Sequence, residues 1–97
     1  MRIIARGTLR KFWLKNSDSE QPLKAWFQEA KRAEWSNPAE IKANYATASI
    51  LKQGRVVFNI RDNKYRLVVK INYKCGWVFI RFIGTHKEYD KINAEEI

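Results

Sequence analysis

The sequence predicts a small α+β domain whose helices precede its sheet, and three observations support this. Apolar residues recur at helical spacing up to about residue 43. From residue 48 the pattern changes to β-branched and aromatic runs separated by three tight turns. A chain of 97 residues is too short to divide into two cores, so we expect one domain spanning residues 1–97. The predicted architecture is an N-terminal short strand and helices packed on an antiparallel four-stranded meander sheet.

The N-terminal third is expected to form one short strand and two helices. Residues 1–5 carry two adjacent isoleucines and suit a short strand that joins the sheet. Thr8 is expected to cap a helix over residues 9–15. A second helix, over residues 20–34, has the clearest helical spacing. Its apolar face consists of Leu23, Trp26, Phe27 and Ala30.

The rest of the chain is expected to form a third helix and the sheet. A short helix is predicted from Pro38 to about Ala43, with Asn37 as its cap. The change of period then predicts four strands in a meander. These strands are expected at residues 49–52, 55–60, 65–73 and 77–83.

Side-chain alternation assigns the two faces of the predicted sheet. In the third strand of the meander, one set of residues is apolar and is expected to pack on the helices. This set consists of Tyr65, Leu67, Val69 and Ile71. Arg66 and Lys70 point the other way and would line an open, basic face. Burying Arg81 would require a partner, so we expect it to be exposed on that same face.

Composition excludes several classes of protein. An apolar fraction of 45% argues against disorder, and no apolar run approaches the roughly 20 residues that span a bilayer. We therefore expect a cytoplasmic protein that does not bind membranes. Cys75 is the single cysteine and His86 the single histidine, which excludes an internal disulfide and a structural zinc site. We expect no cofactor and no bound metal.

The positive charge is concentrated on the predicted sheet. The chain has a net charge of +9, and residues 52–91 contain ten basic residues against three acidic ones. Positive charge concentrated on one element favours binding of a polyanion or of a strongly acidic protein. The alternative interpretation is a basic surface that is only solvated and binds no partner. If the partner is RNA, the basic residues of the strands and turns are expected to contact it. These are Arg55, Arg61, Lys64, Lys70 and Lys87.

Polar side chains with catalytic potential follow the last predicted strand, where His86, Tyr89 and Asp90 lie within five residues. Cleavage of RNA requires a base for the 2′-hydroxyl, cations for the charge that develops on phosphorus, and an acid for the leaving 5′-oxygen. Histidine suits the first or third task, and arginine suits the second. The candidate catalytic residues are Arg66, Arg81, His86 and Tyr89.

Each of these residues also has a simpler interpretation. His86 would serve equally well as a surface or capping residue. Arg66 and Arg81 would serve as phosphate contacts or as ion-pair partners of Glu88 and Asp90. Tyr89 would pack the C-terminal segment onto the sheet. From the residues alone, the prediction is therefore a small basic domain that binds RNA.

Three stretches resemble the HigB family of bacterial toxins, which belongs to the RelE-like superfamily of type II toxin–antitoxin systems. These stretches are residues 55–60 (RVVFNI), residues 63–69 (NKYRLVV) and residues 85–91 (THKEYDK). The resemblance runs from about Ser36 to Ile92. It implies a RelE-like fold and a metal-independent mRNA interferase, an endoribonuclease that cuts mRNA in the ribosomal A site and inhibits translation. It also implies contact with 16S rRNA and a HigA-like antitoxin with a helix-turn-helix domain.

The resemblance extends to individual residues. Arg66 matches the arginine after the family's central turn, and Arg81 falls on the basic position of the last strand. His86, Tyr89 and Asp90 fall on the terminal motif. Asp90 would orient His86 or pair with a lysine.

Two other functions remain open at this stage. One is a non-catalytic RNA-binding module that uses the same basic face. The other is an interaction subunit whose basic face holds an acidic partner. No helix-turn-helix is evident within the chain, so we expect no direct DNA binding.

Overall fold

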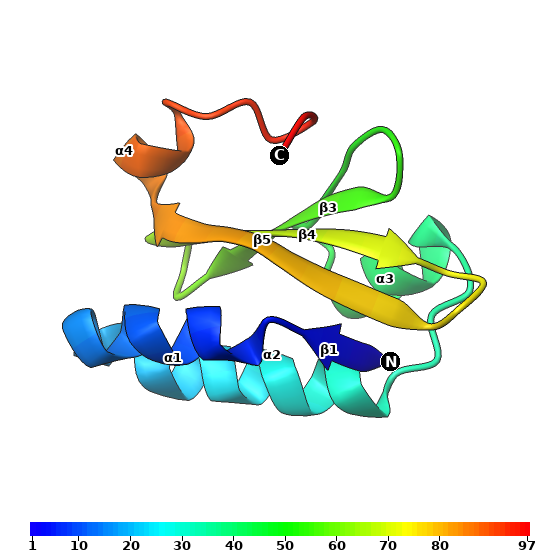
Figure 1. Ribbon diagram of the computed structural model, residues 1–97, viewed down its shortest axis with the longest axis horizontal. Coiled ribbons are helices and arrows are strands. Elements are labelled where there is room, and N and C mark those ends of the chain that lie inside the picture. Colours follow the sequence, from blue (N-terminus) through cyan, green and yellow to red (C-terminus); the bar gives the residue numbers. More distant parts are fainter.

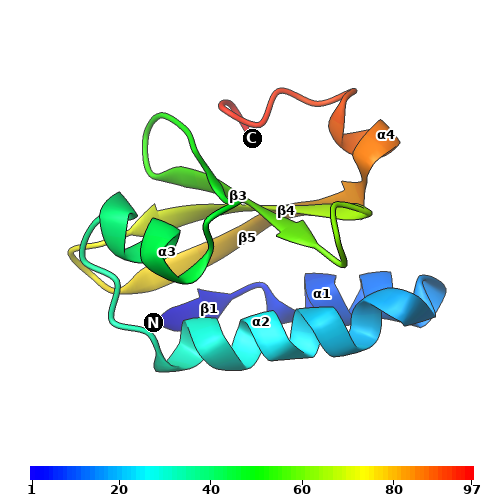
Figure 2. The same cartoon turned by 180° about the vertical axis from the view of Figure 1, so that it is seen from behind.

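The computed structural model describes residues 1–97 and has two layers, a sheet and the helices that cover one of its faces. Helices α1 and α2 lie side by side beneath the sheet, while α4 and the C-terminal segment lie above it (Figures 1 and 2). The helices are α1 (Arg6–Lys15), α2 (Glu20–Arg32), α3 (Pro38–Asn44) and α4 (His86–Tyr89). The strands are β1 (Arg2–Ile4), β2 (Ser49–Ile50), β3 (Arg55–Ile60), β4 (Tyr65–Asn72) and β5 (Trp77–Thr85).

The predicted α+β class is confirmed, and the sheet has one more strand than the meander. Its strand order is β1-β5-β4-β3-β2. The four strands of the predicted meander pair antiparallel, whereas β1 pairs parallel to β5 and makes the sheet mixed. The strand predicted over residues 49–52 is only two residues long, Ser49–Ile50, so β2 forms a short edge. Short edge strands limit unwanted pairing with other chains.

The boundaries of the first two helices differ from the prediction. Thr8 does not cap α1, because the helix already begins at Arg6. Ala5 holds the N-cap position with a left-handed φ of 72°, so the chain turns into the helix directly after β1. Helix α2 ends at Arg32, two residues before the predicted end at residue 34, because the backbone of Ala33 is extended. The cap predicted for α3 is confirmed, since the Asn37 side chain accepts a hydrogen bond from the Glu40 amide.

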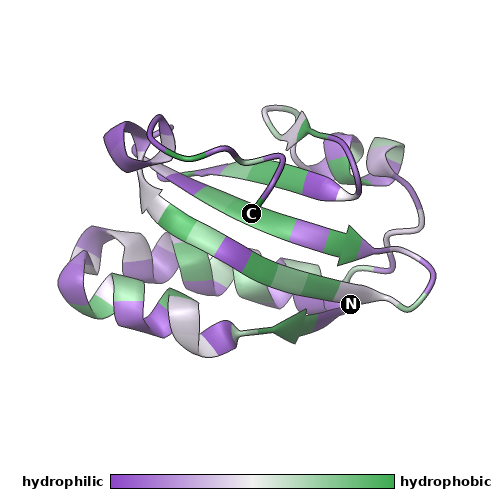
Figure 3. Ribbon diagram, turned by 45° about the horizontal axis from the view of Figure 1, so that its top comes forward, coloured by the Kyte–Doolittle hydropathy of each residue, from purple (hydrophilic) through white to green (hydrophobic).

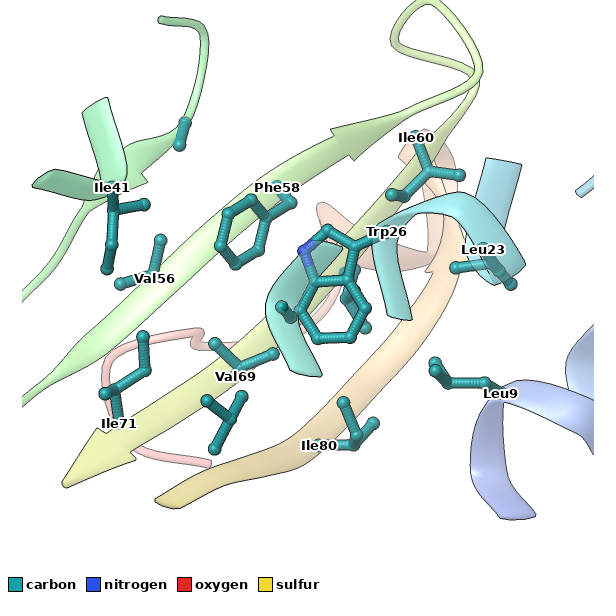
Figure 4. Close-up of a cluster of buried hydrophobic side chains, with 14 of the residues drawn as sticks. Leu9, Leu23, Trp26, Ile41, Val56, Phe58, Ile60, Val69, Ile71 and Ile80 are labelled. Carbon is teal, nitrogen blue, oxygen red and sulfur yellow. The ribbon is translucent and has the colours of Figure 1, made fainter. Parts of the chain in front are cut away.

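The main core lies between the sheet and the helices (Figure 4). As predicted, the apolar set of β4 packs into this core. Phe58 of β3 is 1% exposed, and its ring lies 5.4 Å from that of Trp26 on α2. Trp35 and Tyr45 pack against the same ring, which makes it the centre of an aromatic cluster. The side chains of β4 that alternate with this set, among them Arg66, therefore lie on the opposite side of the sheet.

That other side, which we call the distal face, is only partly open. It consists of the β4 residues Arg66, Val68 and Lys70 and the β5 residues Phe79, Arg81 and Phe82. The C-terminal segment crosses it (Figure 3), and Ala94 packs on Val57 and Val68 in a second, small core. Val68 is consequently fully buried. The sequence predicted an open basic face, and the structure divides that face into two exposed ends.

Candidate active site

The last strand carries a β-bulge that determines where Arg81 lies. Val68 pairs with Phe82 and Val69 pairs with Ile80, so Arg81 is the extra residue on β5. A bulge bends the strand and redirects the side chain at the inserted residue. The Arg81 guanidinium lies 5.8 Å from the centroid of the Phe79 ring, and Arg81 is exposed as predicted. Its side chain therefore points back toward the start of β5.

The other end of β5 leads directly into α4. Thr85 caps this helix: its hydroxyl accepts the Glu88 amide at 3.1 Å, and Glu88 Oε1 accepts the Thr85 amide at 2.8 Å. These two hydrogen bonds form a capping box. Bonding to the Thr85 amide and hydroxyl lowers the pKa of the Glu88 carboxyl. The predicted strand end at residue 83 is also extended by two residues, to Thr85.

His86 is the first residue of α4, and both its backbone and its ring contact other residues. Its amide donates to the carbonyl oxygen of Lys64 at 3.3 Å, which ties α4 to the start of β4. Its Nδ1 lies 3.2 Å from Oδ2 of Asp90, one helical turn later. Both side chains are more than half exposed, at 57% and 60%. The contact engages one ring nitrogen, and Nε2 has no hydrogen-bond or ion-pair partner within the protein.

Arg66 and Tyr89 lie at the same end of the distal face as His86. In the strand register, Arg66 is paired with Gly84, two residues before His86. Arg66 Nη1 donates to the carbonyl oxygen of Asn63 at 2.7 Å, so the turn between β3 and β4 supports its guanidinium. Tyr89 is half-buried against the small core under the C-terminal segment, and its hydroxyl makes no hydrogen bond within the protein. The structure thus brings three of the four candidate catalytic residues together.

Arg81 is the candidate that lies apart. It lies three positions before Gly84, a distance of roughly 10 Å along a strand. Its guanidinium is also aimed at Phe79, away from His86. Neither Arg66 nor Arg81 forms an ion pair with Glu88 or Asp90, because Glu88 caps α4 and Asp90 contacts His86. The predicted ion-pair interpretation of these two arginines is therefore wrong.

The predicted RNA-contacting residues have varied surroundings. Lys64 and Arg61 lie 2.5 Å and 3.4 Å from Asp18 Oδ2, in a network that joins the α1–α2 connection to the β3–β4 turn. Arg55 is only 7% exposed and donates through Nε to the carbonyl oxygen of Ile97, so it secures the C-terminal segment. Lys70 lies partly exposed on the distal face, and Lys87 is exposed on α4.

Two features of this region were not predicted from the sequence. One is helix α4, although Thr85-His86-Lys87-Glu88 fits the capping-box pattern that announces a helix start. The other is a groove at the far end of the distal face, with Phe79 among its lining residues. Because of the bulge at Arg81, Phe79 (paired with Lys70) and Phe82 (paired with Val68) both lie on the distal face, although strict alternation would place them on opposite faces.

The structure contains no group of three or more His, Cys, Asp or Glu side chains arranged to hold a metal ion. None of its helices has the length and apolar character needed to cross a bilayer. Cys75 is free and exposed in the turn between β4 and β5.

Comparison with known protein families gives one match. Residues 19–92 match the model of the HigB toxin family, described as the RelE-like toxic component of a toxin–antitoxin system. No curated protein sequence matches the chain. The matched range includes α2, α3, strands β2 to β5 and the whole of α4, and so it contains every residue at the His86 end of the distal face. The chain therefore belongs to the HigB family of RelE-like toxins, the toxic components of toxin–antitoxin systems.

Proposed function

We propose that this toxin is a ribosome-dependent mRNA endonuclease that cuts its substrate at the His86 end of the distal face. The observation that carries the proposal is the placement of His86. A capped helix holds it beside Asp90, and it stands at the same end of the sheet as Arg66. A base and a fixed cation are the two groups that cleavage of a phosphodiester by its own 2′-hydroxyl most requires.

The steps follow from the groups present. His86 Nε2 takes the proton of the 2′-hydroxyl, and the 2′-oxygen attacks the adjacent phosphorus. Arg66 stabilises the extra negative charge on the pentacoordinate phosphorus, because its guanidinium keeps its charge at any physiological pH. As the bond between phosphorus and the 5′-oxygen breaks, the leaving oxygen takes a proton from the Tyr89 hydroxyl, or from water where Tyr89 instead stacks on a base. The products carry a 2′,3′-cyclic phosphate and a 5′-hydroxyl.

Asp90 acts as a positioning residue in this proposal. Its Oδ2 lies 3.2 Å from His86 Nδ1 and fixes which ring nitrogen faces the substrate. It also stabilises the imidazolium that forms when Nε2 accepts the proton. No metal is needed, because arginine supplies the positive charge.

The positive charge of the protein favours its association with RNA. The net charge of +9 gives non-specific attraction to RNA, and Arg66, Lys70, Arg81 and Lys87 have no acidic partner that would weaken it. We propose that the ribosomal A site, with its mRNA and 16S rRNA, is the place of action in the cytoplasm. The antitoxin that the family implies is proposed to be a HigA-like helix-turn-helix protein.

Induced expression in a bacterium tests the proposal. Wild type, His86→Ala, Arg66→Ala and the control Lys11→Ala would be expressed, with growth and mRNA 5′-ends followed. Lys11 is an exposed cation of α1, on the opposite side of the sheet. We expect growth arrest and translation-dependent cuts with wild type and Lys11→Ala, and neither with the other two.

Two results would contradict the proposal. Growth arrest without cuts would favour an RNA-binding module that does not cleave. If soluble, folded wild-type protein causes no growth arrest, the proposal that this toxin acts by cutting mRNA is wrong.

A further inference from the structure

The distal face carries a second feature at the end opposite His86. A groove of about 580 Å³ lies there, between the β4–β5 turn and the Gln53-Gly54 turn, and it is within the size range of ligand sites. Its principal lining residues are Gln53, Lys70, Asn72, Lys74, Phe79 and Arg81. We call it the Phe79 groove. Nothing in the proposed cleavage chemistry uses it.

The charges of the Phe79 groove are all positive. Lys70, Lys74 and Arg81 line it, and no acidic residue does. None of the three forms a salt bridge, and none of their side chains donates a hydrogen bond within the protein. By contrast, Lys64 and Arg61 both lie against the carboxylate of Asp18. Three uncompensated cations around one hollow attract an anionic ligand.

The groove also presents aromatic surface. Phe79 is half-buried, lines the groove and is paired with Lys70 across the strands. Trp77, two residues earlier on the same side of β5, meets it edge to face with ring centroids 6.0 Å apart. Trp77 is 38% exposed, which is unusual for so large an apolar side chain. Aromatic rings beside cations form the usual platform for single-stranded nucleic acid, in which bases stack on the rings and phosphates pair with the cations.

We propose that the Phe79 groove is a subsite for a nucleotide of single-stranded RNA that flanks the cleaved bond. Its base stacks on Phe79 or Trp77, and its phosphates contact Lys70, Lys74 and Arg81. This inference rests on the proposed endonuclease function, because the groove and His86 then hold one RNA strand. Phe79 and Thr85 are six residues apart on β5, roughly 20 Å, a distance that several nucleotides span.

The proposal gives Arg81 a binding role and not a catalytic one. The bulge places its guanidinium over Phe79, where it contacts the phosphate of a stacked nucleotide and not the phosphate that is cut. An acidic protein segment would contact the three cations but would make no specific use of the aromatic rings of Phe79 and Trp77. RNA uses both.

Binding of a fluorescent 12-nucleotide RNA to the full chain, followed by anisotropy, tests this subsite. Phe79→Leu keeps an apolar side chain and removes the ring, so we expect affinity to fall about 5- to 100-fold. Arg81→Met is expected to reduce the slope of log affinity against log salt by about one. Lys11→Met, an exposed cation outside the face, is the matched control and should keep both affinity and slope. Thermal melting checks that each variant is folded.

Several outcomes would overturn the subsite. Wild-type RNA affinity in folded Phe79→Leu would exclude stacking, and equal affinity for free AMP and RNA would indicate a mononucleotide site. If these variants lose binding to a poly-Glu peptide but not to RNA, the groove holds an acidic protein.

Two further results separate this inference from the proposed function. Unchanged binding by Phe79→Leu together with lost cleavage by His86→Ala would reject the subsite and leave the endonuclease. Weakened binding by Phe79→Leu without any translation-dependent cleavage by wild type would reject the endonuclease and leave an RNA-binding groove.

Discussion

Thr85 and Glu88 hold each other in a reciprocal pair of hydrogen bonds at the point where the last strand becomes a helix. The two bonds measure 3.1 Å and 2.8 Å, and His86 lies between their donors. A helix of four residues is too short to be stable by its own backbone hydrogen bonds. The position of the proposed catalytic base therefore depends on this cap and on the packing of Tyr89.

Removal of the cap is expected to affect activity more than stability. Thr85→Ala loses the hydroxyl that accepts the Glu88 amide, which costs about 1 kcal/mol of folding free energy. We expect mRNA cleavage to fall about tenfold or more, while RNA affinity stays near that of wild type. Thr85→Ser retains the hydroxyl and is the control that should cleave normally. Equal cleavage rates for the alanine and serine variants would show that the cap does not position His86.

Two glycines make a contrasting pair of alanine substitutions. A Cβ at Gly84 would lie 2.5 Å from Cζ of Phe82 and 3.2 Å from Oε1 of Glu88, so both neighbours must move. We expect Gly84→Ala to lower both thermal stability and cleavage. Gly7 lies in α1 with no atom near its added Cβ, so Gly7→Ala should stabilise the protein by up to about 1 kcal/mol. Melting curves that rank the two variants in the opposite order would contradict this account.

Acid stability should depend on Asp18. Hydrogen bonds from Lys64 and then Tyr65 lower the pKa of its carboxyl from the ordinary 3.8. A lowered folded-state pKa stabilises the protein above the unfolded-state pKa, and this stabilisation is lost as pH falls through the folded-state value. We expect Asp18→Asn to melt at a lower temperature than wild type at pH 7, with the difference shrinking as pH falls below 3.8. A difference as large at pH 2 as at pH 7 would rule out this carboxylate as the source.

The aromatic cluster should dominate the stability of the main core. Phe58 is 1% exposed and contacts three aromatic rings, so Phe58→Ala should cost about 3–5 kcal/mol in the free energy of unfolding. Leu14 is 69% exposed on α1, and Leu14→Ala should change that energy by less than about 0.5 kcal/mol. Urea titration measures both. A loss below 1 kcal/mol for Phe58→Ala would mean that the cluster repacks around the gap.

Much of this fold could be predicted from local pattern. Alternation of side chains along β4 identified which face meets the helices, because every second side chain of a strand points to the same side of the sheet. The Asn37 cap of α3 follows from side-chain chemistry within a few residues. Each of these features depends only on residues that are close together in the sequence, so it could be predicted without knowing the fold.

The site could be predicted only in part, because its decisive features are not local. The β-bulge at Arg81 cannot be recognised from the sequence of an apolar strand, yet it determines the direction of the Arg81 side chain. The covering of Val68 depends on a contact with Ala94, and a few apolar residues in a short C-terminal segment do not show where the segment packs. The placement of Arg66 and His86 at the same end of the sheet follows from strand register, which becomes known only once the pairing is known.

The most direct test of the central claim, RNA cleavage at the His86 end of the sheet, is single-turnover cutting of a defined mRNA held in the A site of purified ribosomes. Wild type should produce fragments with a 2′,3′-cyclic phosphate and a 5′-hydroxyl. His86→Ala, folded and still bound, should cut at least about 100-fold more slowly. An mRNA left intact by folded wild type, or one that His86→Ala cuts at the wild-type rate, would contradict the account.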